Sequence, residues 1–331
     1  MVNERFTVLD GWRGISILVV LACHLLPLGP KPLQLNYDAG LLGMALFFTL
    51  SGFLVTSFLL HKDNVLDFLV RRFFRILPLA WLYIVVSLSI FAADFQTWIS
   101  HLSFSADYMP KLFIPHVTDH LWSLCVEIHF YLGIALLVAL FKKKGLLFIP
   151  LLCIAVTGFR VMNEVQVAFV THLRIDEILA GCVLALIYEQ KLGQTVINFI
   201  KDQNFWLVLL LLIVSCHPAG GAFMFLRPYF AALLIGITLL QPDLKVNKLL
   251  NHKFLFYVAT ISYALYVLHP LLASTWLGSG EGWDKYMKRP ILFLVLFVCA
   301  HVSTLYLEKP CIAFGKSFSN FLNVRFNHAK K

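Results

Sequence analysis

Long runs of apolar residues, separated by short polar segments, dominate the chain. Most runs approach the roughly 20 residues that a helix needs to cross a hydrocarbon core about 30 Å thick. Several are shortened or broken by Gly and Pro, as in Cys216 to Gly221, which is typical of tilted or interrupted helices around a cavity. The pattern predicts about ten transmembrane helices, over residues 14–29, 40–60, 78–95, 120–141, 145–161, 174–189, 205–217, 227–241, 254–273 and 290–307.

Composition agrees with this pattern, since 60% of residues are hydrophobic and 14% are charged. Such a chain is no water-soluble domain, and we expect an all-α integral membrane protein. Lys and Arg concentrate in alternate loops, which predicts cytoplasmic termini. The net charge of +9 is explained by this asymmetry and by contact with anionic membrane lipids, so we expect no nucleic-acid partner. These loops contain Lys62, residues 71–75, 142–144 and 245–253, and the C-terminal tail.

The chain reads as one membrane domain over residues 1–310, followed by a basic cytoplasmic tail over residues 311–331. Its first apolar run lacks the flanks of a cleaved signal peptide, so we expect a retained helix.

The seven cysteines show no CxxC spacing. His116 and His120 have i, i+4 spacing but no evident third ligand, so we expect no metal site.

Arg13 and His24 stand out because they are ionisable residues in the first apolar segment. Their separation of eleven residues returns the second side chain to within about 20° of the first, about 16 Å along the helix. Charged groups are costly in hydrocarbon, so their presence favours a functional role. The alternative is that Arg13 extends to the membrane surface and His24 is a structural histidine.

Glu127 is a second intramembrane candidate, at a predicted depth similar to that of His24. Its i, i+4 spacing places it on one helix face with Ser123 and Tyr131. We expect Glu127 to orient His24 and stabilise its cationic form. An interhelical structural hydrogen bond is the alternative.

Arg71, Arg72 and Arg75 form a basic, aromatic entry to the third predicted helix. Together with Arg13 they predict an anion site suited to the phosphates of a cytosolic molecule. The alternative is that they only reflect the excess of basic residues on the cytoplasmic side.

Six motifs, in order along nearly the whole chain, resemble the membrane acyltransferase-3 family of bacterial O-acyltransferases. Trp12 stands where many members of that family have Leu. The motifs are Leu9-Asp10-Gly11-Trp12-Arg13-Gly14 with His24; Leu46-Phe47-Phe48-Thr49-Leu50-Ser51-Gly52-Phe53-Leu54; Arg71-Arg72 with Arg75 and Pro78; Trp122-Ser123-Leu124 with Glu127 and Phe130-Tyr131; Ile261-Ser262-Tyr263-Ala264-Leu265-Tyr266 with His269-Pro270; and Glu308-Lys309-Pro310.

The resemblance implies transfer of an acyl group, usually acetyl, from cytosolic acyl-CoA to a carbohydrate hydroxyl on the outer side of the bacterial inner membrane. It implies that Arg13 and His24 are required and that Arg72 and Arg75 serve the acyl donor. The acyl-CoA is a co-substrate, and no permanently bound cofactor is expected. Some members carry a fused extracytoplasmic esterase-like domain, which this sequence lacks, so we expect any second transfer step to use a separate partner.

The resulting hypothesis has the CoA phosphates bound by Arg71, Arg72 and Arg75, with Arg13, and the pantetheine arm extending through the bundle. His24, polarised by Glu127, then acts as general base on the acceptor hydroxyl or as a covalent acyl relay, and both alternatives stay open. The candidates for contacts with substrate are Asp10, Ser51, Trp122, Ser123, Tyr131, Tyr263, Tyr266 and His269.

Two other function classes fit some of these features. A proton-coupled transporter or flippase of a glycan precursor also has intramembrane His, Glu and Arg in broken helices. A noncatalytic membrane partner of a polysaccharide assembly complex is the third reading. Binding of acyl-CoA distinguishes the enzyme from both. The acyl group, the acceptor glycan, whether free or lipid-linked, and the oligomeric state stay open.

Overall fold

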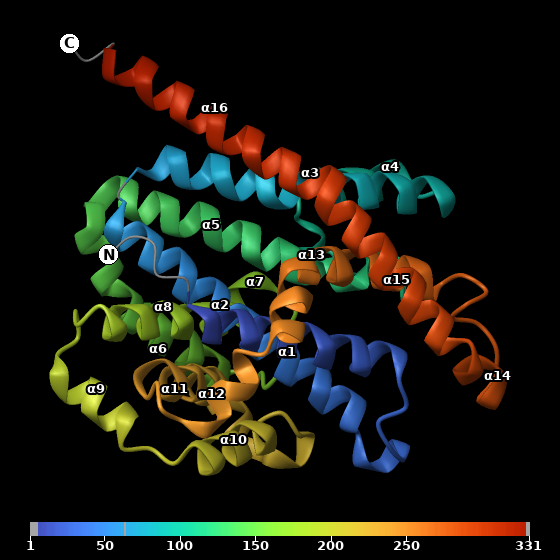
Figure 1. Ribbon diagram of the computed structural model, residues 1–331, viewed down its shortest axis with the longest axis horizontal. Helices are drawn as coiled ribbons and strands as arrows, with labels where there is room; N and C mark the ends of the chain where they lie inside the picture. The colour runs from blue at the N-terminus through green and yellow to red at the C-terminus, as the bar shows by residue number, and fades with distance from the viewer. Residues whose placement is uncertain (1–5, 63, 329–331) are drawn as a thin grey trace. The chain divides into compact units, whose positions relative to one another are not determined.

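The computed structural model describes residues 6–62 and 64–328, and within these ranges the chain is helical and contains no strand (Figure 1). Contacts divide the chain into two units. Unit 1 comprises the residues up to His61 together with Lys143–Ser262, and unit 2 comprises Lys62–Lys142 together with the residues from Tyr263 onward. Each unit is described by itself below.

Unit 1 is built around α2 and α8. Helix α2 packs against both α1 and α8, and α8 also contacts α11. Its helices are α1 (Thr7–Leu25), α2 (Leu35–His61), α6 (Ile149–Met162), α7 (Thr171–Arg174), α8 (Asp176–Tyr188), α9 (Gln194–Lys201), α10 (Phe205–Val214), α11 (Arg227–Leu240), α12 (Lys245–Leu250) and the first part of α13 (Lys253–Ala273), with short 3-10 turns η1 (Lys31–Leu33), η5 (Lys142–Phe148) and η6 (Pro218–Leu226).

The crossing of α2 and α8 depends on two glycines. A Cβ atom on Gly52 would lie 1.9 Å from the backbone oxygen of Ile178, and one on Gly181 would lie 2.0 Å from that of Thr49. Each helix therefore presents a glycine to the backbone of the other, as is common where membrane helices approach closely.

Unit 2 is built on α3, which packs against α5 and α16. Figure 1 shows α16 running alongside α3, and the ring of Phe74 in α3 packs at a tilt against those of Phe314 and Phe318. The helices of the unit are α3 (Val65–Ile90), α4 (Phe95–Leu102), α5 (Trp122–Phe141), the second part of α13, α14 (Gly282–Met287), α15 (Arg289–Ser303), a π-helical turn η7 (Thr304–Glu308) and α16 (Lys309–His328), with 3-10 turns η2 (Ala106–Tyr108), η3 (Pro110–Leu112) and η4 (Asp119–Leu121).

Each of the ten predicted segments contains a helix, and the all-helical fold is that of a multi-pass membrane protein. By length and composition, seven helical stretches in the described residues are long and apolar enough to cross a membrane, or eight if α9 and α10, bent by 87°, form one span. The count of ten spans and the cytoplasmic location of the termini stay predictions.

Several predicted helix boundaries were wrong. The first helix ends at Leu25 and not at residue 29, because Pro27 cannot continue the hydrogen bonding. The third begins at Val65 and not at residue 78, so Pro78 lies inside α3, and the arginines are on the helix itself. Beyond Glu308 the chain continues as α16 through His328, and Lys330 and Lys331 of the predicted tail lie outside the described residues.

Candidate functional site

Helix α1 of unit 1 carries Asp10, Arg13 and His24. The Arg13 Nη1 atom lies 3.8 Å from Asp10 Oδ1, and both side chains are 16% exposed. His24 is exposed and is the next-to-last residue of α1. The two predicted chemical groups, Arg13 and His24, therefore lie toward opposite ends of one helix, about 16 Å apart along its axis.

The other residues of the first motif have a packing role. A Cβ atom on Gly11 would lie 2.1 Å from the backbone oxygen of Leu250, so α1 and α12 approach closely there. Trp12 is 4% exposed, and its Nε1 atom donates to Thr238 Oγ1 at 2.9 Å. Trp12 thus fills the core of unit 1, and Asp10 and Arg13 are left as the polar residues of the motif.

The His24 end of α1 is joined directly to the start of α2. Asn36 Nδ2 donates to the backbone oxygens of Cys23 and Leu26, both at 2.7 Å. This amide satisfies carbonyl groups that the end of a helix leaves without intrahelical partners. Ser51, another predicted candidate, is buried in the middle of α2 beside the Gly52 crossing.

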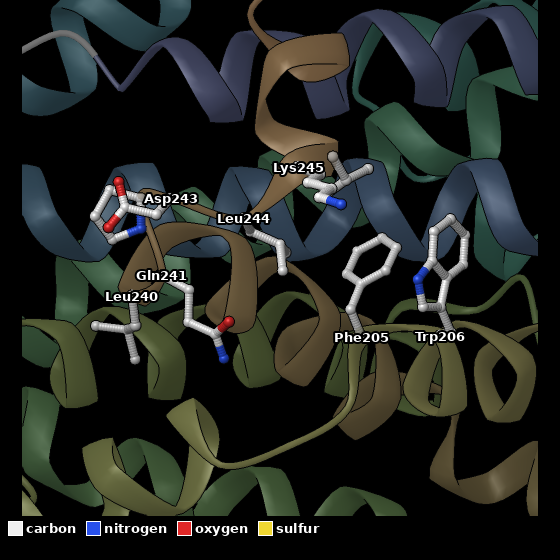
Figure 2. A pocket seen from close by; sticks show the side chains of 9 residues that line it. Phe205, Trp206, Leu240, Gln241, Asp243, Leu244 and Lys245 are labelled. Atoms are coloured by element: carbon white, nitrogen blue, oxygen red, sulfur yellow. The ribbon is translucent and has the colours of Figure 1, made fainter.

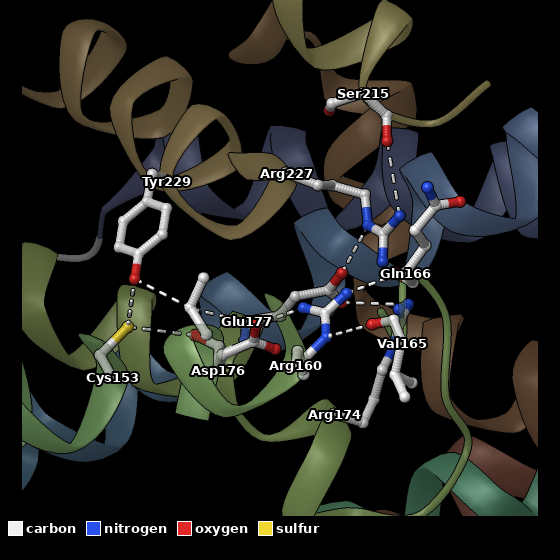
Figure 3. Close-up of polar contacts among 11 residues, drawn as sticks. Cys153, Arg160, Val165, Gln166, Arg174, Asp176, Glu177, Ser215, Arg227 and Tyr229 are labelled. Carbon is white, nitrogen blue, oxygen red and sulfur yellow. Dashed lines mark hydrogen bonds and ion pairs between the residues drawn. The ribbon is translucent and has the colours of Figure 1, made fainter. Parts of the chain in front are cut away.

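Unit 1 also contains a buried set of five charged residues that the sequence reading missed. We call it the charge cluster, and Figure 3 shows its contacts. Arg160 Nη1 donates to Asp176, Arg227 Nε donates to Glu177 Oε1 at 2.7 Å, and Arg174 Nη2 lies 3.2 Å from Glu177 Oε2. All five side chains are at most 1% exposed. The members are Arg160, Arg174, Asp176, Glu177 and Arg227.

Neutral groups complete the charge cluster. Arg160 Nε donates to the backbone oxygen of Val165 at 3.2 Å, and Thr157 Oγ1 donates to Asp176 Oδ2 at 3.3 Å. Its members come from the ends of α6 and α7 and the starts of α8 and α11. In the sequence these positions border apolar runs, where charges are ordinary, and only the fold shows that they converge.

In unit 2 the three arginines of α3 have different surroundings. Arg71 Nε donates to Asp67, and its Nη2 lies 3.5 Å from Asn320 Oδ1. The Arg72 guanidinium lies over the ring of Tyr131, 5.7 Å from its centroid. Arg75 interacts electrostatically with Glu308, which accepts from Thr304 Oγ1 at 2.8 Å. The predicted trio is therefore spread over three environments on one helix.

The spacing argument for α5 is confirmed for two residues. Tyr131, one turn after Glu127, donates its hydroxyl to the Glu127 carboxylate, and both side chains are buried. Tyr131 therefore contacts Arg72 with its ring and Glu127 with its hydroxyl. His24 belongs to unit 1 and Glu127 to unit 2, so the proposed pairing of these two residues stays a prediction.

Ser123 belongs to a second polar group of unit 2. Its hydroxyl contacts the hydroxyl of Tyr266, which also donates to the backbone oxygen of His120 at 2.6 Å. His269 Nδ1 lies 2.7 Å from the backbone oxygen of Tyr266, and its ring centroid lies 5.5 Å from that of His120. Tyr266 thus joins α5 to α13, a contact between residues 143 positions apart that no local pattern indicates.

The two remaining candidates have local environments of their own. Tyr263 donates its hydroxyl to the backbone oxygen of Ile76 at 2.6 Å, which ties α13 to α3 within unit 2. Trp122 is the first residue of α5. Among the described residues, no group of three or more His, Cys, Asp or Glu side chains is arranged to hold a metal ion.

A cavity of about 680 Å³ lies in unit 1, between the start of α10, the end of α11 and the start of α12 (Figure 2). Its walls include the rings of Phe205 and Trp206 and the side chain of Lys245. It is lined by none of the candidate residues described above. The cavity lies at the end of α11 and the charge cluster at its start, so the two are about 20 Å apart, the length of this 14-residue helix.

Comparison with known proteins gives the family. The model of a family described as "Acyltransferase domain", acyltransferase-3, matches residues 6–308. O-acetyltransferase OatA of Staphylococcus aureus is 25% identical over 351 residues, which cover 91% of this chain and 56% of that protein. Putative peptidoglycan O-acetyltransferase YrhL of Bacillus subtilis is 26% identical over 370 residues, covering 94% and 56%. Peptidoglycan O-acetyltransferase OatA of Listeria monocytogenes is 24% identical over 357 residues, covering 91% and 55%.

The chain thus spans about half the length of these curated relatives. No solved structure matches it. The family match includes α1 with Arg13 and His24, the arginines of α3, the polar residues of α5 and α13, and Glu308. With its long apolar helices and this match over nearly its whole length, the chain belongs to the acyltransferase-3 family of membrane acyltransferases.

Proposed function

We propose that this protein transfers an acyl group, with acetyl the expected one, from cytosolic acyl-CoA to a hydroxyl of a cell-envelope carbohydrate at the outer side of the bacterial inner membrane. The observation that carries the proposal is the family match over residues 6–308, together with the activity for which the relatives are named, O-acetyl transfer. Those relatives act on peptidoglycan according to two of their names, so a peptidoglycan glycan is the first acceptor to test.

On the donor side, the phosphates of acyl-CoA are bound by the guanidinium groups of Arg71, Arg72 and Arg75, with Arg13 contributing from α1. Planar guanidiniums donate paired hydrogen bonds to phosphate oxygens. The position of Arg72 over Tyr131 supports this role, because contact with the ring holds the guanidinium in place on α3.

At the chemical step, His24 accepts the proton of the acceptor hydroxyl as that oxygen attacks the thioester carbonyl carbon. A carbon–oxygen bond forms, the carbon–sulfur bond breaks, and CoA leaves as a thiol after taking up the proton. Glu127 stabilises the cationic form of His24 in this scheme. In the alternative scheme the acyl group first bonds to a ring nitrogen of His24 and then moves to the hydroxyl.

The transfer assay uses labelled acetyl-CoA and soluble peptidoglycan fragments with the purified protein in lipid vesicles. We expect His24→Ala to lower acyl transfer by about 100-fold to 10,000-fold, the contribution typical of a general base, while binding of acetyl-CoA persists. His252→Ala is the matched control, because His252 is also an exposed histidine of unit 1.

Full transfer by His24→Ala would remove His24 from the chemical step. If the wild-type protein neither binds nor transfers any of several acyl-CoA donors, the enzyme proposal fails, and a transporter or flippase becomes the better explanation. A wild-type protein that binds acetyl-CoA but transfers only when a separate extracytoplasmic protein is added would indicate a second transferase partner.

A further inference from the structure

A buried donor and a buried acceptor face the same short segment of unit 1. Arg227 is completely buried, with Nε bonded to Glu177 and Nη1 donating to the backbone oxygen of Ser215 at 3.5 Å. Asp38 directs Oδ2 toward His217 Nε2 at 4.0 Å. Within residues 6–62 and 64–328, the buried Arg227 Nη2 and Asp38 Oδ1 atoms have no hydrogen-bond partner.

The two side chains flank the residues that follow α10. Arg227 contacts Ser215, Asp38 contacts His217, and Cys216 between them interacts electrostatically with both charged groups. A buried guanidinium donor and a buried carboxylate acceptor therefore contact the first and the third of three consecutive residues. Leaving such groups unmatched in the protein interior is unfavourable, so a ligand that satisfies both is favoured.

This pair belongs to the end of unit 1 that carries His24. Asn36, two residues before Asp38, donates to the backbone oxygen of Cys23, the neighbour of His24. Two residues after Asp38, a Cβ atom on Gly40 would lie 3.0 Å from Cys23 Sγ. The start of α2 therefore brings Asp38 beside the last turn of α1.

The chemistry of the pair selects a hydroxyl group. An alcohol donates its O–H to a carboxylate and accepts an N–H at its oxygen, so the hydroxyls of one sugar satisfy both atoms. An anionic ligand would be repelled by Asp38, and a cationic one by Arg227. The Asp38 side chain is 13% exposed, which gives access, whereas Arg227 is held in position by Glu177.

We propose that Asp38 and Arg227 bind hydroxyls of the carbohydrate acceptor and so hold the acceptor beside His24. This inference rests on the proposed function, which supplies the acceptor class. Asp38 accepts from one sugar hydroxyl, and Arg227 donates through Nη2 to another hydroxyl of the same acceptor. Neither residue belongs to the motifs from which the site was predicted.

The test is Asp38→Asn in the transfer assay, with the soluble glycan fragments as the varied substrate. Loss of a hydrogen bond to a charged group lowers kcat/KM for the acceptor by about 10-fold to 100-fold. The affinity for acetyl-CoA, measured without acceptor, stays at the wild-type value. Asp202→Asn, an exposed carboxylate of the same unit, is the matched control and leaves all these quantities unchanged.

Fragments with single hydroxyls replaced by hydrogen separate binding from a structural effect. If Asp38 binds one particular sugar hydroxyl, removing that hydroxyl lowers kcat/KM of the wild-type protein by the same factor as Asp38→Asn does on the parent fragment. On that deoxy fragment, Asp38→Asn then lowers kcat/KM no further. The inference is overturned if Asp38→Asn keeps the wild-type kcat/KM, or if its loss is equal on parent and every deoxy fragment. Direct titration of the fragments into wild type and variant tests the site even if no transfer occurs, so the two proposals fail separately.

Discussion

The carboxylates of Asp176 and Glu177 in unit 1 contact guanidinium groups directly, whereas in unit 2 the carboxylate of Glu127 accepts from Tyr131, whose ring lies under Arg72. Direct, fully enclosed ion pairs fix their partners in one geometry. The Tyr131 side chain instead contacts both an arginine and a carboxylate, and so holds Arg72 and Glu127 in place. The comparison therefore indicates that the charge cluster mainly holds α6, α7, α8 and α11 together, and it agrees with the proposed role of Arg72 in binding the acyl donor.

The largest effect should come from breaking an ion pair of the charge cluster. Asp176→Asn leaves the Arg160 guanidinium buried without its counterion, and removal of one partner of a buried pair destabilises by about 3–5 kcal/mol. We expect most of the variant to be lost as aggregate when purified in detergent, and the remainder to unfold at a much lower temperature. Thermal unfolding followed by size-exclusion chromatography measures this.

Asp284→Asn is the control for that change. Asp284 pairs with Lys288 at 2.8 Å, but its side chain is 64% exposed, and exposed pairs contribute about 0–1 kcal/mol. The double variant Arg160→Met with Asp176→Leu should recover much of the loss, because it removes both charges. If Asp176→Asn is as stable as the control, the charge cluster does not hold unit 1 together.

A smaller effect is expected for Tyr131→Phe in unit 2. The phenyl ring keeps the contact with Arg72, but the buried Glu127 carboxylate loses a donor, which costs about 1–3 kcal/mol. Acyl transfer should fall while binding of acetyl-CoA is retained, because the ring that holds Arg72 is still present. Melting temperature and donor affinity, measured on the same preparation, test both statements.

Tyr83→Phe gives the matched comparison, because Tyr83 is also buried in unit 2 and donates to a neutral acceptor, the backbone oxygen of Val117, at 2.6 Å. Loss of a neutral bond should cost less, about 1 kcal/mol, and should leave acyl transfer largely unchanged. Equal losses of transfer in the two variants would contradict a special role for the contact of Tyr131 with Glu127.

The same comparison shows which parts of the site can be predicted from sequence. The Tyr131 to Glu127 contact follows from helical spacing, which is a local rule. Arg13 and His24 were found because ionisable residues inside an apolar run are conspicuous. By contrast, the pairing of Arg227 with Glu177 joins positions 50 residues apart, at helix ends where charges are ordinary, and only the packing of α8 against α11 reveals it.

The fold shows a similar division. The apolar runs predicted where helices occur. The residues at which the helices begin and end depend on single residues, such as proline, whose effect varies with the neighbouring groups. Pro27 ends the helix before it, whereas Pro78 lies inside α3. Proline is tolerated within membrane helices when neighbouring groups satisfy the freed carbonyl. The short helices α4, α9 and α12 have no long apolar run and were not predicted.

The smallest expected effect concerns pH and again separates the units, because unit 2 buries the imidazole of His101. This side chain is 2% exposed, with Nδ1 2.8 Å from the backbone oxygen of Thr97 and Nε2 2.9 Å from Thr118 Oγ1. Burial lowers the pKa of His101 below its ordinary value, an effect that the hydrogen bond to Thr97 partly opposes. The unfolded chain therefore binds the proton more readily than the folded one.

It follows that the contribution of His101 to stability is complete above the ordinary histidine pKa of about 6.5 and falls as the pH drops below that value. His101→Gln retains hydrogen-bonding groups but does not titrate, so its melting temperature should change less between pH 7 and pH 5 than that of the wild-type protein. His116→Gln, which alters an exposed histidine of the same unit, should keep the wild-type dependence. If the melting temperature of His101→Gln depends on pH as that of the wild-type protein does, the acid sensitivity arises from other groups. The buried neutral imidazole of His101 would then not be what distinguishes unit 2.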